Sequence, residues 1–129
     1  MKLLLDTHIW LWSLKDTHRL GAGVQAELRN SQNELWLSPI STWEALTLHQ
    51  KGRVYLAQDL DQWVARSTAP FREAALTHEI VNAARILPLP QRDPADRFLA
   101  ATAKVLDLTL VTADTSLLGL GEIATLGNR

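Results

Sequence analysis

Short apolar runs alternate along this chain with longer segments that have helical periodicity. Four such runs, at residues 2–5, 34–38, 108–111 and 123–126, are four or five residues long. Most of their positions are apolar, without a regular alternation of apolar and polar residues. Strands that are buried on both faces have this pattern, whereas half-exposed strands alternate apolar and polar positions. An extended stretch at 71–76 is expected to form a short further strand or a link. The pattern therefore predicts a largely parallel sheet.

Helices are expected between these runs, at residues 9–14, 24–30, 41–51, 60–67, 77–86 and 94–106. The third of them is predicted to open with a capping box, Ser41-Thr42-Trp43-Glu44, and to stop at Gly52. The fifth should be capped by Thr77 and broken by the prolines in 87–90. Strands that alternate with helices predict an α/β fold: three layers, α/β/α, with a central, mainly parallel sheet of four to five strands and helices on both faces.

The helix at 94–106 has the clearest signals in the chain. Asp93 followed by Pro94 is typical of an N-cap with proline at the first helical position. Its alanines allow close approach to a sheet. Arg97, Ala101 and Lys104 recur at helical spacing, so they are expected to form its solvent-facing side.

Size and composition narrow the classes of protein that need considering. A chain of 129 residues is expected to form a single domain, 1–129. It contains no cysteine, which excludes disulfides and thiolate metal sites and agrees with a reducing, cytoplasmic location. Asp6 interrupts the first apolar run before a signal peptide could form, and no run approaches the length of a membrane span, so no membrane association is expected.

The net charge of −1 carries no overall signature of nucleic-acid binding. A chain of this charge that handles RNA would need a local basic surface.

Acidic residues mark the ends of predicted strands and the starts of predicted helices. Asp6 follows the first strand, Asp114 follows the strand at 108–111, and Glu44 and Asp96 lie near helix starts. In parallel α/β sheets these positions share the carboxyl edge of the sheet, where sites form. Carboxylates gathered there repel one another and need a cation. Oxygen ligands without cysteine or a histidine pair favour Mg²⁺ or Mn²⁺ over Zn²⁺.

Each acid also has a purely structural interpretation. Glu44 could complete a capping box with Ser41, Asp96 is favoured by the helix dipole, and Asp114 could belong to a turn. Asp93 is interpreted as a cap. Asp6 is the hardest to explain in this way, and the joint placement of the four favours a site.

Four segments, in order, resemble the PIN-domain nucleases, and in particular their toxin members of the VapC type. They are residues 3–12, with Asp6-Thr7-His8; 38–44, which end at Glu44; 92–103, with Asp96; and 108–114, which end at Asp114. One such segment would be weak, but four in order are specific.

The resemblance implies a Mg²⁺- or Mn²⁺-dependent endoribonuclease that is the toxin of a toxin–antitoxin pair. It implies that Asp6, Glu44 and Asp96 are the core metal ligands and catalytic acids, with Asp114 as a more variable fourth and Thr112 as a supporting polar residue. It also implies an RNA substrate, a small antitoxin protein as partner, and a homodimer.

Several other side chains have two interpretations. Arg97 could contact phosphate or be a solvated charge of its helix. His8 is interpreted as structural or hydrogen-bonding rather than as a base. Trp36 is expected in the core, and one of Trp10 and Trp12 should face outward. Trp43, beside Glu44, could stack on RNA bases, but core packing or an antitoxin groove is favoured.

Other functions stay open from the residues alone. An aspartyl phosphatase would place a second Asp two positions after its nucleophile, where this chain has His8, and a receiver module would need a Lys after a late strand, which 112–114 lack. A third alternative is a catalytically silent module that kept the fold.

Overall fold

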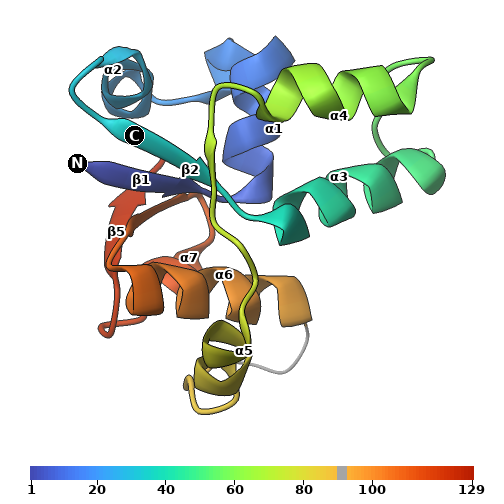
Figure 1. Ribbon diagram of the computed structural model, residues 1–129. Helices are drawn as coiled ribbons and strands as arrows, with labels where there is room; N and C mark the ends of the chain where they lie inside the picture. The colour runs from blue at the N-terminus through green and yellow to red at the C-terminus, as the bar shows by residue number, and fades with distance from the viewer. Residues whose placement is uncertain (90–92) are drawn as a thin grey trace.

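The computed structural model describes residues 1–89 and 93–129. Five parallel strands form one sheet in the order β3-β2-β1-β4-β5. Their bounds are β1 Lys2–Leu5, β2 Glu34–Leu37, β3 Arg72–Glu73, β4 Thr109–Thr112 and β5 Ala124–Gly127. This confirms the expected sheet, and the ribbon in Figure 1 shows helices on both of its faces.

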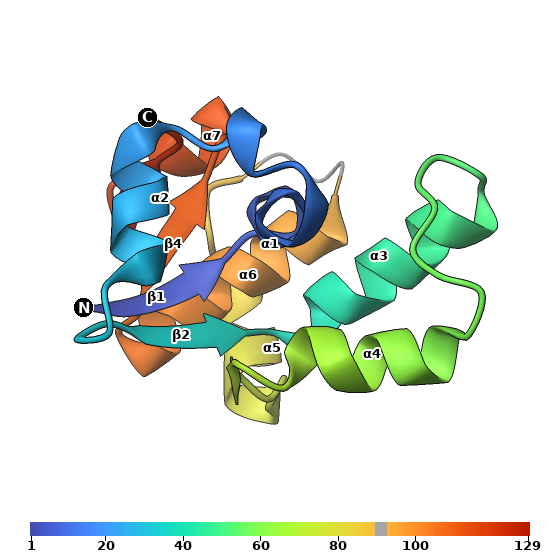
Figure 2. The same cartoon turned by 90° about the horizontal axis from the view of Figure 1, so that it is seen from above.

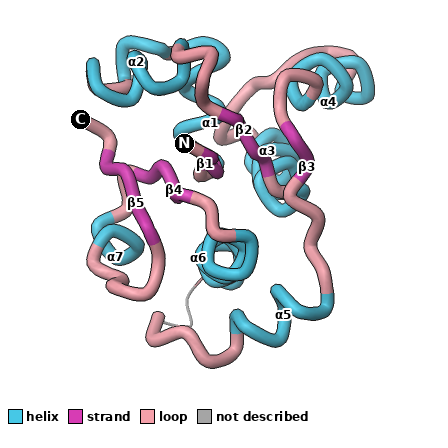
Figure 3. The backbone as a smooth tube through the Cα atoms, turned by 60° about the vertical axis from the view of Figure 1, so that its left-hand side comes forward, coloured by secondary structure: helices cyan, strands magenta, loops and turns pink. Residues whose placement is uncertain are grey.

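Eight helical segments connect the described strands. They are α1 Thr7–Lys15, the 3₁₀ turn η1 Thr17–Arg19, α2 Ala22–Arg29, α3 Pro39–Gln50, α4 Leu60–Thr68, α5 His78–Ala84, α6 Pro94–Leu106 and α7 Thr115–Leu118. Figure 3 shows α5, α6 and α7 on one side of the strands and α1, α2 and α4 on the other. Within the described residues no helix combines the length and apolar character needed to cross a bilayer.

Successive side chains of the central strand feed two separate cores. Leu4 packs with α5, α6 and α7, while Leu3 and Leu5 pack with α1, α2 and α4. All three leucines are fully buried. Side chains alternate across a strand, so a strand segment covered on both faces must be apolar at every position, as Leu3, Leu4 and Leu5 are.

The helices depart from the expected ones at identifiable points. The capping box at Ser41 is wrong, because α3 begins earlier: Ser38 is its N-cap, accepting from the Ile40 amide at 3.1 Å, and Pro39 is its first residue. Ser41 therefore lies inside the helix, where its hydroxyl is buried and has no hydrogen-bond partner among the described residues. The segments η1 and α7 were not predicted. Pro90, in the expected break, lies outside the described residues.

The expected solvent face of α6 is also wrong. Lys104 is exposed and pairs with Glu122 at 3.1 Å, but Ala101 is fully buried and Arg97 is only 8% exposed. The helix packs on the sheet and on α5 as well, so its buried surface extends around two sides.

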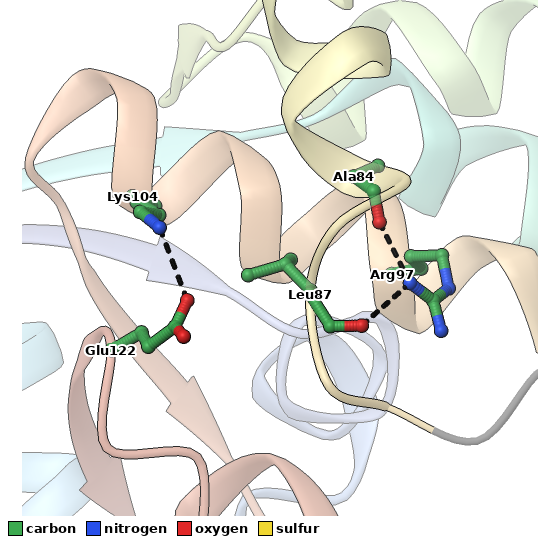
Figure 4. Close-up of polar contacts among 5 residues, drawn as sticks. All are labelled: Ala84, Leu87, Arg97, Lys104 and Glu122. Carbon is green, nitrogen blue, oxygen red and sulfur yellow. Dashed lines mark hydrogen bonds and ion pairs between the residues drawn. The ribbon is translucent and has the colours of Figure 1, made fainter.

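The Arg97 guanidinium holds the end of α5 instead of meeting solvent. It donates to the carbonyl oxygens of Ala84 at 2.7 Å and Leu87 at 2.8 Å (Figure 4). It also donates to the carbonyl oxygen of Leu89. These carbonyls lie at and beyond the carboxyl end of α5, where a helix leaves acceptors unpaired and a cation is favourable. The clamp ties the end of α5 and the residues up to Leu89 to α6.

We expect Arg97→Ala to lower the free energy of unfolding by about 2–4 kcal/mol, because it leaves buried carbonyl groups without a donor. Arg97→Lys should lose less, since one ammonium can satisfy part of the set. The matched control is Lys104→Ala on the same helix, which removes an exposed ion pair of about 0–1 kcal/mol. Urea unfolding measures all three, and equal losses for Arg97→Ala and Lys104→Ala would contradict the clamp.

Candidate functional site

Asp6 lies where β1 ends, buried at the carboxyl edge of the sheet. Its amide continues the ladder by donating to the Val111 carbonyl at 3.0 Å, and its carboxylate caps α1 by accepting from the Thr7 amide at 2.7 Å. The side chain is only 8% exposed. A carboxylate buried this far needs hydrogen bonds to stay charged.

Thr112, the last residue of β4, supplies the second hydrogen bond to Asp6. Its hydroxyl donates to Asp6 Oδ2 at 2.6 Å and accepts from the Asp114 amide at 3.0 Å. One buried side chain thus orients Asp6 and fixes the backbone of Asp114. The supporting position that the family resemblance implied for Thr112 agrees with these contacts.

Glu44 reaches the same edge from α3. It lies in the second turn of the helix, so the capping explanation for it is removed. The Thr7 hydroxyl, itself buried, donates to Glu44 Oε1. Thr7 therefore connects to Asp6 through its amide and to Glu44 through its hydroxyl, and sequence reasoning missed this role because threonine after a strand has many structural explanations.

Asp96 and Asp114 belong to the starts of α6 and α7. Asp96 is in the first turn of α6, whose N-cap is Asp93, accepting from the Ala95 amide at 2.9 Å as expected. Asp114 is an N-cap rather than a simple turn residue, accepting from the Ser116 amide at 2.8 Å. Figures 1 and 2 show the amino ends of α1, α3 and α6 close together beyond the ends of β1 and β2.

The charges of these acids act on one another. Burial first, and then the charges of Asp93, Asp6, Asp114 and Glu44, raise the pKa of Asp96 to about 7. Burial also raises the pKa of Asp6, although its bonds to Thr112 and Thr7 partly oppose this. Glu44 behaves likewise: burial raises its pKa and the Thr7 hydroxyl opposes the shift. The structure thus brings the other three predicted acids, and Asp93 as a fifth, within electrostatic reach of Asp96.

These carboxylates form no ion pairs within the residues that the structure describes. In the same residues, no three acidic or histidine side chains stand as a group that could hold a metal ion. The donors fit a hard divalent cation in kind, since all are carboxylates whose mutual repulsion a cation would relieve, but they would have to draw together around it.

Other predicted residues lie near the cluster or away from it. His8 is exposed, and its charge lowers the pKa values of Asp6 and Glu44. Arg97 is buried and contacts backbone carbonyls, so its interpretation as a solvated charge is wrong; contact with phosphate stays a prediction.

The burial of the tryptophan side chains agrees only in part with the predictions from the sequence. Trp10 is fully buried while Trp12 is half-buried, and Trp36 packs half-buried against the core. Trp43 is 64% exposed, which contradicts core packing for it.

The profile of the PIN domain family matches residues 3–122 of this sequence. The chain belongs to the PIN domain family. Ribonuclease VapC22 of Mycobacterium tuberculosis is 30% identical over 116 residues, which are 89% of this chain and 88% of that protein. The PIN domain assignment agrees with the order in which the four acidic segments occur.

Solved structures share the fold of this PIN domain at low sequence identity. VapBC2 from Rickettsia felis, bound to a DNA fragment from its promoter, matches all of both chains at a TM-score of 0.73 and 15% identity. FitAcB from Neisseria gonorrhoeae matches 98% of this chain and 97% of its own at 0.71 and 18%. VapBC from Salmonella typhimurium, bound to DNA, matches 100% and 99% at 0.72 and 14%.

Asp96 should make stability depend on pH. Its carboxyl keeps a proton up to about pH 7 when folded but loses it near pH 4 when unfolded, so the folded state binds more protons in this window. Its contribution to stability is therefore present below about pH 4, falls as the pH rises to about 7, and is constant above that.

We expect Asp96→Asn, without divalent cations, to raise the free energy of unfolding at about pH 8 by on the order of 1 kcal/mol, a figure reduced for solvent screening of a half-exposed carboxyl. Near pH 4 the gain should vanish. Urea unfolding in EDTA at both pH values measures it, with Glu122→Gln as a surface control. An equal gain at both values would exclude the titration of Asp96 as its cause.

Thr112→Val should lower the free energy of unfolding by about 1–3 kcal/mol, because Asp6 loses a buried donor and the Asp114 amide loses its acceptor. Thr112→Ser should retain most of the stability. The matched control is Thr102→Val, also fully buried, whose hydroxyl donates only to the Phe98 carbonyl of its own helix. If the two valine variants lose the same free energy of unfolding, the two hydrogen bonds of Thr112 do not give it a special role in stability.

Proposed function

We propose that this PIN domain is a Mg²⁺- or Mn²⁺-dependent endoribonuclease and the toxin of a toxin–antitoxin pair. The observation that carries the proposal is the group of mutually repelling carboxylates at the carboxyl edge of the sheet. Asp6 is buried, the other three predicted acids are partly buried, and none of them forms an ion pair among the described residues. The similarity to a ribonuclease over nearly the whole chain supports the reaction, and the toxin–antitoxin complexes among the structural neighbours support the biological setting.

Asp6, Glu44, Asp96 and Asp114 would hold the cation, as direct or water-mediated ligands. A bound divalent cation would supply an activated water and neutralise charge on the phosphate. The chain itself orients the ligands: the Thr112 hydroxyl and the Thr7 amide fix the two oxygens of Asp6, and the Thr7 hydroxyl fixes Glu44. Asp96, with a pKa of about 7, would hold a cation in its deprotonated form.

The partners belong to the same proposal. An antitoxin protein would cover the acidic cluster, RNA would be the substrate, and two copies would form a homodimer. The cytoplasmic location expected from the cysteine-free composition stays a prediction.

A phosphatase of another class fits less well. The position two residues after Asp6 is His8, which is exposed at the start of α1 and supplies no second carboxylate. A catalytically silent PIN module would not need a group of acids whose mutual repulsion opposes folding.

We expect the wild-type chain to cleave single-stranded RNA with Mg²⁺ or Mn²⁺ and to lose this activity with EDTA. Asp6→Asn keeps the size and can still accept the Thr7 amide, but it removes a ligand charge, so activity should fall at least about 100-fold. Cleavage is followed on a labelled RNA by gel electrophoresis.

Asp59→Asn is the matched control, since Asp59 caps α4 through the Gln62 amide at 3.1 Å and asparagine caps equally well. It should cleave like wild type. Full activity in Asp6→Asn would refute the metal mechanism. Cleavage by the purified wild type that EDTA does not stop would refute it too.

A further inference from the structure

A groove with a volume of about 760 Å³ lies beside α1, away from the sheet. It is lined by α1, the end of α3, the connection at 53–56 and α4. Figure 2 shows the hairpin of α3 and α4 projecting to one side of α1. The proposed mechanism does not use this groove.

Two aromatic rings in the groove are accessible, and a cationic side chain lies near each ring. Tyr55 is 67% exposed, and Lys15 Nζ lies 5.7 Å from the centre of its ring. Trp12 is half-buried, with the Arg19 guanidinium carbon 5.5 Å from its ring centre. Rings with neighbouring cations can stack on nucleobases while the cations meet the phosphates.

The groove is strongly basic although the chain is not. Lys15, Arg19, Arg53 and Arg66 line it and are exposed, against a single acid, Asp16. None of the four forms an ion pair within the described part of the chain. This is the local basic surface that a chain of net charge −1 would need in order to bind a polyanion.

His8 connects the groove with the acidic cluster. It lines the groove and lies 5.9 Å, centre to centre, from the Trp12 ring. It is also close enough to Asp6 and Glu44 for its charge to act on both carboxyls. The end of the groove at His8 therefore lies next to the carboxylates, and an extended ligand in the groove would reach them there.

We propose that this groove binds single-stranded RNA next to the cleaved bond, with a base stacked on Tyr55 and phosphates on Arg53 and Arg66. The assignment rests on the proposed function, because it makes the groove the substrate track of the same site. The apolar wall would also admit a peptide, but four cations that form no ion pair with a described residue, beside accessible rings, complement a polyanion with flat bases better.

The test measures binding of short fluorescein-labelled oligouridine and oligoadenosine by anisotropy, in EDTA to prevent cleavage. Tyr55→Ala should weaken binding by about 5- to 100-fold, and Tyr55→Phe, which keeps the ring, should restore it. Arg53→Gln with Arg66→Gln should reduce the slope of log affinity against log salt by about 0.7 for each phosphate that the variant no longer neutralises.

Arg72→Gln is the matched control, because the Arg72 guanidinium lies 5.9 Å from the Trp36 ring in a similar pair outside the groove. Its affinity and salt slope should match wild type. Unchanged affinity in both Tyr55→Ala and the double variant overturns the proposal and leaves the groove to a protein partner. A uniform loss that includes Arg72→Gln overturns it too, since binding would then be spread over the surface.

Cleavage assays separate this inference from the proposed activity. If RNA binds in the groove but wild type with Mn²⁺ cleaves none, the nuclease function fails and the groove assignment stands. If wild type cleaves RNA and the groove variants keep its KM, the function stands and the groove assignment fails.

Discussion

The hydrogen bond from the Thr112 hydroxyl to Asp6 joins β4 to β1 at the point where the acidic cluster is assembled. Burial alone would push the Asp6 carboxyl toward its neutral form, and this bond opposes that shift. The same hydroxyl receives the Asp114 amide, so two predicted acids depend on one side chain. Because β1 and β4 are parallel neighbours, their carboxyl ends bring the two acids to one edge.

Threonine hydroxyls, rather than cationic side chains, hold the cluster in the described residues. Thr112 connects Asp6 with Asp114, and Thr7 connects Asp6 with Glu44. Hydroxyls orient carboxylates without neutralising them, so the negative charge stays available to a cation. Proteins commonly accept such local destabilisation where function requires it. The guanidinium of Arg97, a buried residue that follows Asp96 in the sequence, is occupied with carbonyl groups.

The sheet and most helices could be predicted because their signals are local. Leu3, Leu4 and Leu5 indicate a strand covered on both faces, and Asp93-Pro94 marks the start of α6. The placement of the four acids followed from the same topology. The failures depend on tertiary contacts: α6 packs against α5 as well as the sheet, so Arg97 is buried where its spacing suggested solvent. The bond from Thr7 to Glu44 joins residues 37 positions apart, a separation that no local pattern encodes.

The tryptophans also give the molecule its own optical probes. Trp10 and Trp63 are buried with ring centres 5.3 Å apart, so their emission follows the integrity of the core behind the sheet. Trp43 is exposed and directly precedes Glu44 in the sequence, so a paramagnetic ion at the carboxylates would quench its fluorescence. Trp12 lies in the basic groove. Single-tryptophan versions could therefore separate unfolding, ion binding and groove occupancy in one unlabelled chain.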